Sequence, residues 1–121
     1  MAELAERCNV IEESYEFMLA YAAQGVADGT EIREYLSRAA QSLKGLSAVA
    51  REELDSPFVA VLERDATDAL AAVELALAQS AISSQLIDNL NASIHLRALL
   101  TDLFLIDEVL KAQRQSPVST T

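Results

Sequence analysis

The chain contains 121 residues and carries a formal net charge of −10, from 19 acidic and 9 basic side chains. Its length suits one domain whose core needs neither a disulfide nor a metal, and Cys8, the only cysteine, excludes an intrachain disulfide. The charge excludes direct nucleic-acid binding, which rests on clustered Lys and Arg. No apolar run approaches the ~18 residues of a membrane span. We therefore expect no nucleic-acid and no membrane partner, whereas a protein with a basic surface is compatible with the charge.

Long stretches with helical apolar spacing, interrupted by only three glycines and two prolines, predict an all-α fold. The first helix is expected from about Ala2 to Gln24. Its apolar seam is spaced alternately by four and three residues, and consists of Leu4, Cys8, Ile11, Tyr15, Met18 and Ala22. Cys8 in this seam predicts a buried, unreactive thiol, and Glu12 one turn later should raise its pKa.

Gly25 should end this helix, and residues 26–29 should form a loop with Thr30 as the next N-cap. The second helix repeats the seam spacing at Ile32, Leu36, Ala39, Leu43, Leu46 and Ala50. Gly45 lies inside this pattern and marks either a bend or a close helix contact. At the boundary between the second and third helices, Ser56 should be the N-cap of the third helix and Pro57 its first residue.

The third helix is expected from Pro57 to about Gln79, with Leu62, Ala66, Ala69, Val73 and Leu77 facing inward. Residues 78–84 lack glycine and proline, so two arrangements are open. A turn capped by Ser83 or Ser84 gives an up-down-up-down four-helix bundle whose last helix ends near Gln115. An uninterrupted helix instead gives a helical hairpin plus one long C-terminal helix in a dimer. Matched helix lengths favour the bundle, with residues 1–115 as a single domain and 116–121 as a flexible tail.

The sharpest acidic pattern is Glu12-Glu13-Ser14-Tyr15-Glu16, followed by Glu31-Ile32-Arg33-Glu34. It resembles the EExxE and later ExxD signature of the all-helical nucleoside-triphosphate pyrophosphatases, although Glu34 replaces the final Asp. The resemblance implies a magnesium site formed by Glu12, Glu13, Glu16, Glu31 and Glu34 beside a substrate's phosphates. Glu13 and Glu16, however, fall opposite the first seam, which favours a solvated face.

Few other residues suggest a site. His95 is the only histidine, which excludes a di-iron site built from two Glu-x-x-His motifs within one chain, and we expect no cofactor. Asp88, His95 and Asp102 fall on one stripe of the last helix, two turns apart. This stripe predicts either a polar seam for a ligand, ion or pH response, or ordinary polar groups paired with a neighbouring helix.

The excess of apolar residues on the first and last helices is a stronger indication of function than these polar residues are. The first helix has a second stripe beside its seam, and the last helix is apolar around most of its circumference, which requires burial on nearly all sides. A homodimer should therefore form through Val10, Phe17, Tyr21, Leu99, Phe104, Leu105 and Val109.

The sequence thus predicts a small acidic helical protein that acts by protein–protein interaction, as an adaptor, regulator, assembly chaperone or accessory subunit. The acidic start of the chain, Met1-Ala2-Glu3, differs from a secretory signal, so the cytoplasm is the expected compartment. A magnesium-dependent hydrolase and a bundle that binds a small apolar ligand are the alternatives.

Overall fold

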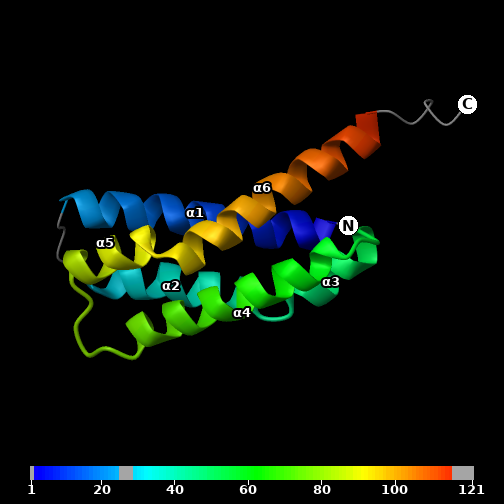
Figure 1. Cartoon of the computed structure of the whole chain (residues 1–121). Coiled ribbons are helices and arrows are strands. Elements are labelled where there is room, and N and C mark those ends of the chain that lie inside the picture. Colours follow the sequence, from blue (N-terminus) through cyan, green and yellow to red (C-terminus); the bar gives the residue numbers. More distant parts are fainter. Residues whose placement is uncertain (1, 25–28, 116–121) are drawn as a thin grey trace, which may run out of the picture.

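A computed structural model of the chain describes residues 2–24 and 29–115. This part consists of helices and their connections, without strands, which confirms the all-α prediction. The helices are α1 (Ala2–Gln24), α2 (Gly29–Leu43), α3 (Leu46–Glu53), α4 (Phe58–Leu77), α5 (Ser84–Ala92) and α6 (Ile94–Gln115) (Figure 1). The expected flexible tail, residues 116–121, lies outside the described residues, as does most of the first loop, residues 25–28.

The first two helices bury the predicted seams. In α1, Leu4, Ile11 and Met18 are buried, while Cys8 and Tyr15 pack against the core from its edge. All six predicted seam positions of the second helix are buried. The start of α2 was predicted incorrectly, because the helix begins at Gly29 and Thr30 therefore lies in its first turn rather than at the N-cap.

Gly45 breaks the expected second helix into α2 and α3. Its φ is +71°, a left-handed conformation that glycine adopts without the steric cost of a Cβ. A Cβ placed there would meet nothing within 4 Å. Of the two explanations offered for this glycine, the structure therefore selects the bend and not the close helix contact.

The start of α4 lies one residue after the predicted one, because the helix begins at Phe58 and Pro57 (φ −58°, ψ −19°) directly precedes it. The Ser56 side-chain oxygen accepts a hydrogen bond from the Phe58 N–H at 3.1 Å, which is the contact expected of an N-cap. The inward positions Leu62, Ala66, Ala69 and Val73 are all buried, and Leu77 is half-buried. Alanine at two of these positions lets neighbouring helices approach α4 closely.

A turn separates α4 from α5, so the alternative with one long C-terminal helix is wrong. Ser83 caps α5, because its side-chain oxygen accepts from the Leu86 N–H at 3.0 Å. The continuous last helix that the bundle prediction assumed is also wrong. Ser93 adopts an extended conformation (φ −66°, ψ 146°) that ends α5, and its side-chain oxygen accepts from the Leu96 N–H at 3.3 Å, which starts α6.

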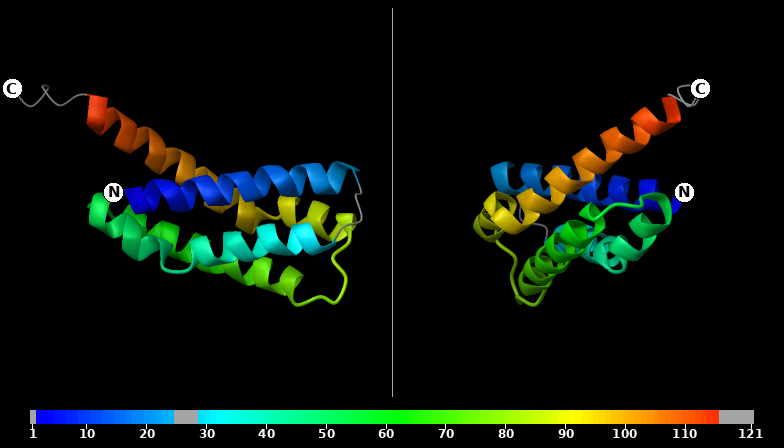
Figure 2. Two further views of the ribbon diagram at one scale, coloured as in Figure 1. Left: turned by 180° about the vertical axis from the view of Figure 1, so that it is seen from behind. Right: turned by 45° about the vertical axis from the view of Figure 1, so that its right-hand side comes forward.

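The helices pack around one connected core that contains side chains from all six. α1 packs mainly against α2 and α5, and α4 packs against α2, α3 and α6. The last turns of α6 diverge from the other helices, as both further views show (Figure 2). None of the described helices combines the length and the apolar character that crossing a membrane requires.

Candidate functional site

The five glutamates of the pyrophosphatase-like pattern do not converge on a metal site. Glu13 lies 3.8 Å from the Arg38 guanidinium, and both side chains are more than half exposed. Glu16, Glu31 and Glu34 are also exposed, as a solvated face requires. Among the described residues, no three His, Cys, Asp or Glu side chains lie together in a way that could hold a metal ion.

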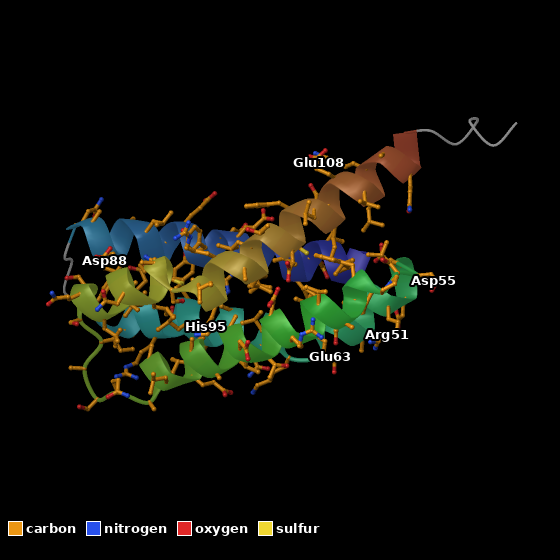
Figure 3. All side chains as sticks on the ribbon, viewed as in Figure 1. Arg51, Asp55, Glu63, Asp88, His95 and Glu108 are labelled. Atoms are coloured by element: carbon orange, nitrogen blue, oxygen red, sulfur yellow. The ribbon has the colours of Figure 1, made fainter. Side chains whose placement is uncertain are left out.

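The predicted polar stripe is divided by the Ser93 break. Asp88 belongs to α5, whereas His95 and Asp102 belong to α6, and both Asp88 and His95 are exposed (Figure 3). Asp102 is only 5% exposed and faces α4, the helix that contacts α6 most extensively. The three side chains therefore do not form one seam.

Asp102 is instead half of a carboxyl pair with Asp65 of α4. Burial, followed by hydrogen bonding and charge repulsion with Asp65, raises the pKa of Asp102 to about 7. The Asp102 Oδ2 atom has no hydrogen-bond partner. Because an unpaired charge is costly in such a position, this pair makes the contact between α4 and α6 sensitive to protonation.

Cys8 lines a pocket of about 120 Å³ between α1, α3 and α6. Burial, followed by the charge of Glu12, raises the pKa of the thiol to about 11, so the predicted direction and the predicted role of Glu12 are confirmed. Asp107 and Glu53 add to this effect from the other two helices. A thiol with this pKa carries almost no thiolate at neutral pH, which favours the predicted unreactive thiol, although Cys8 is half-buried and not buried as expected.

Four of the seven predicted dimer-interface residues are engaged within the chain. Leu99 lies fully in the core, and the buried Tyr21 donates its hydroxyl hydrogen to the Ile82 carbonyl at 2.6 Å. The Phe17 ring stacks on Tyr35 of α2, with centroids 4.2 Å apart. Val10 is half-buried. The second apolar stripe of α1 is therefore explained largely by the packing of α2 and of the α4–α5 turn.

The other three predicted interface residues form an exposed patch on α6. Phe104, Leu105 and Val109 are 56%, 52% and 44% exposed, and we call them the α6 patch. They are half of the large apolar side chains that are exposed in the described part of the chain; the others are Leu19, Leu75 and Ile94, on α1, α4 and the first residue of α6. Only the α6 patch gathers several such side chains within two helical turns.

An apolar groove of about 260 Å³ adjoins this patch. Leu105, Ile106 and Val109 form its α6 wall, while Leu54, Ser56 and Phe58 form the opposite wall at the α3–α4 connection. The Ser56 hydroxyl is already engaged in capping α4, so the groove offers mainly carbon surface.

Acidic side chains also occur on the outer half of α6 and at the α3–α4 connection, but none of them lines the groove. Figure 3 shows Glu108 on the outer half of α6 and Asp55 at the connection between α3 and α4. Asp107 and Glu108 both pair with Lys111, at 3.7 and 3.5 Å, and all three side chains are about half exposed or more. Asp107 lines the Cys8 pocket on the other side of α6, so it does not border this groove.

Sequence reasoning found the α6 wall of the groove and missed the other wall. The signal for Leu54 and Phe58 was present, since two large apolar side chains flank the predicted helix boundary at Ser56-Pro57. Their partners on α6 could not be identified, because the residues that meet are about fifty positions apart in the chain.

No known protein family, curated protein or solved structure matched this chain in the comparisons made. The fold and the surface therefore define it: an all-helical acidic chain with an exposed apolar patch and groove on its last helix.

Proposed function

We propose that this chain acts by protein–protein interaction, as an adaptor, regulator, assembly chaperone or accessory subunit, and that it binds through the α6 patch and the adjoining groove. The observation that carries this proposal is that the exposed Leu105 and Val109 line an apolar groove, with Phe104 also exposed on the same turns of α6. Clustered exposed apolar side chains mark binding sites more often than isolated ones do.

The arrangement of the helices supports a rigid platform for such a surface. We infer that the six helices group into four antiparallel segments: α1, α2 with α3, α4, and α5 with α6. This grouping is the expected up-down-up-down bundle with two bends. The inner half of α6 is fixed by the core, so the outer half presents the patch at a defined position.

Self-association is the second candidate, because the α6 patch contains the part of the predicted homodimer surface that the chain leaves exposed. It would need more than the patch, since a standard interface buries about 800 Å² on each partner. The magnesium-dependent hydrolase is not carried forward, because its glutamates do not meet.

The experiment is a comparison of captured proteins. A tagged chain and a Phe104→Gln/Leu105→Gln variant would be used as baits in the same cell extract, with Leu75→Gln as the matched control. Leu75 is 65% exposed on α4, so the control changes apolar exposure without touching the patch. We expect some captured proteins to bind the wild-type chain and the Leu75→Gln control but not the patch variant. Identical captured sets from the two variants would contradict the proposal.

A further inference from the structure

The carboxyl pair of Asp65 and Asp102 lies within the apolar contact that holds α6 on α4. On α6, the residues one turn before and one turn after Asp102, Leu99 and Ile106, are buried. On α4, the corresponding neighbours of Asp65 are buried as well, and they are Leu62 and Ala69. Asp102 itself is 5% exposed, and its Oδ2 atom has no hydrogen-bond partner. A pair of acidic groups therefore occupies a position where the surrounding contacts are made by carbon.

The contact between the two carboxyl groups depends on a proton. An ionised carboxylate can only accept hydrogen bonds, so Asp65 and Asp102 can bond to each other only while one of them is protonated. When both are ionised, two like charges face each other and Asp102 carries its charge where water does not reach it. Because the pKa of Asp102 is raised to about 7, this change of state falls near neutral pH.

The other charged groups of the neighbouring helices do not act on this pair. Among the described residues, Asp65 is the group whose charge raises the pKa of Asp102. Glu12 of α1 and Glu53 of α3 act on Cys8 instead. The remaining charged side chains nearest in sequence, or on α5, are exposed: Arg64 and Asp68 on α4, Asp88 on α5, and His95 and Arg97 on α6. The two carboxyl groups therefore titrate as one coupled unit.

The pair and the groove are formed by the same part of the molecule. Leu105 and Ile106, in the α6 wall of the groove, follow Asp102 by three and four residues. Phe58, in the opposite wall, precedes Asp65 by two turns on α4. α6 packs mainly against α4 and only to a lesser extent against α5. A force that separates Asp102 from Asp65 therefore also moves one wall of the groove relative to the other.

We propose that Asp65 and Asp102 form a pH-sensitive latch. While the two carboxyl groups share a proton, they hold α6 on α4. When both are ionised, α6 loosens from α4 and its wall of the groove moves outward. The latch is closed in mildly acidic conditions and open in mildly basic ones. It does not depend on the proposed binding function, because it is built from contacts within the chain.

Hydrogen–deuterium exchange with mass spectrometry at pH 6 and pH 8, corrected for the intrinsic pH dependence of exchange, tests the latch. Residues 29–43 of α2 are the internal reference for global opening. From pH 6 to pH 8, the protection of residues 96–106 should fall at least about threefold more than that of the reference. Asp102→Asn should abolish this difference, because its amide donates to Asp65 at both pH values. Asp68→Asn, which removes an exposed carboxylate from α4, should behave like the wild-type chain.

The thiol of Cys8 gives a second measurement, because the α6 side of its pocket consists of Ile106, Asp107 and Leu110. At pH 8, N-ethylmaleimide should label the wild-type chain at least about threefold faster than Asp102→Asn, and the two rates should be equal at pH 6. Comparison at one pH removes the pH dependence of thiol chemistry, and Asp102 is not among the carboxylates that act on the thiol. Asp65→Asn removes the same repulsion from α4 and should give the same result.

Three results would overturn the latch. The first is an equal loss of protection in α2 and α6 of the wild-type chain between pH 6 and pH 8, or no loss in either. The second is a loss confined to α6 that persists in both Asp102→Asn and Asp65→Asn. The third is equal labelling of Cys8 at pH 8 in the wild-type chain and both variants.

Discussion

At the scale of single residues, the buried carboxyl of Asp102 is the most unusual group in the described part of the chain. The sequence placed it on a polar stripe with His95, and the structure places it against Asp65 of α4 instead. Because the folded pKa of about 7 exceeds the ordinary value of about 3.9, the folded state binds a proton more tightly than the unfolded state does.

This difference in pKa between the two states determines how the stability of the fold changes with pH. Below pH ~4 the carboxyl is protonated in both states and contributes no difference. As the pH rises toward 7, the unfolded state loses its proton first, so stability falls and the full penalty is present above pH 7. Asp102→Asn should therefore stabilise the chain at pH 8 by on the order of 2 kcal/mol and flatten this part of its pH profile.

Urea unfolding at pH 4, 6 and 8 measures the effect. Asp107→Asn is the control on the same helix, since its carboxyl is exposed and its removal should change stability by less than about 0.5 kcal/mol. A wild-type free energy of unfolding that rises between pH 5 and 8, with no gain from Asp102→Asn, would show that this carboxyl is ionised at no cost.

At the scale of helices, two arginines satisfy the ends of helices that are distant in sequence. Arg7 of α1 donates to the Ser42 carbonyl at 3.1 Å and to the Lys44 carbonyl, at the C-terminal end of α2. Arg33 of α2 donates to the Leu77 carbonyl at 3.0 Å and to the Gln79 and Ser80 carbonyls just beyond α4. A cation beside unpaired carbonyls also favours the negative end of the helix dipole.

Arg33 should therefore contribute more to stability than an exposed arginine on the same helix. Arg33→Met should lower the free energy of unfolding by about 2 kcal/mol, because a charged donor and three carbonyl contacts are lost. Arg38→Met is the control, since Arg38 makes an exposed ion pair with Glu13 and should cost less than about 1 kcal/mol. Chemical denaturation of both variants gives the comparison. Equal losses in the free energy of unfolding would show that the Arg33 contacts to the end of α4 add no stability.

At the scale of the whole molecule, α6 joins a long part held by the core, up to Leu110, to exposed last turns. Leu96, Leu99, Leu100 and Leu103 lie in the core, whereas Lys111, Ala112 and Gln113 are all exposed beyond Leu110. Local opening is easiest where few buried contacts hold a helix. The turns beyond Leu110 therefore have the lowest expected local stability in α6, whereas Ile106 and Leu110 hold the turns that carry the patch against the core.

Hydrogen–deuterium exchange with mass spectrometry tests this division. Amides in residues 111–115 should exchange at least tenfold faster than amides in residues 96–103, because opening the outer turns exposes little apolar surface. Residues 73–77 are the control, since they form another helix end that is half-buried and held by Arg33. Equal protection along α6 would mean that contacts beyond the described core hold its outer half.

The sequence by itself determined the helical class, the seams and most helix boundaries. Apolar spacing depends on local geometry, so the positions Ile32, Leu36 and Leu62 could be placed in the core before any packing was known. Capping is also local, so Ser56 was identified and Ser83 was one of two options, because their partners lie two or three residues away. The bend at Gly45 was one of two options that its position allowed.

Only the tertiary structure decided which apolar side chains stay exposed and which polar ones are buried. Phe17, Tyr21 and Leu99 resembled interface residues in sequence, but neighbouring helices and the core cover them. Asp102 pairs with Asp65, and Leu105 lies across the groove from Leu54 and Phe58. These residues are far apart in the sequence, and no local pattern predicts which of them come together. Burial depends on contacts between distant segments, so the candidate site is a property of the folded chain.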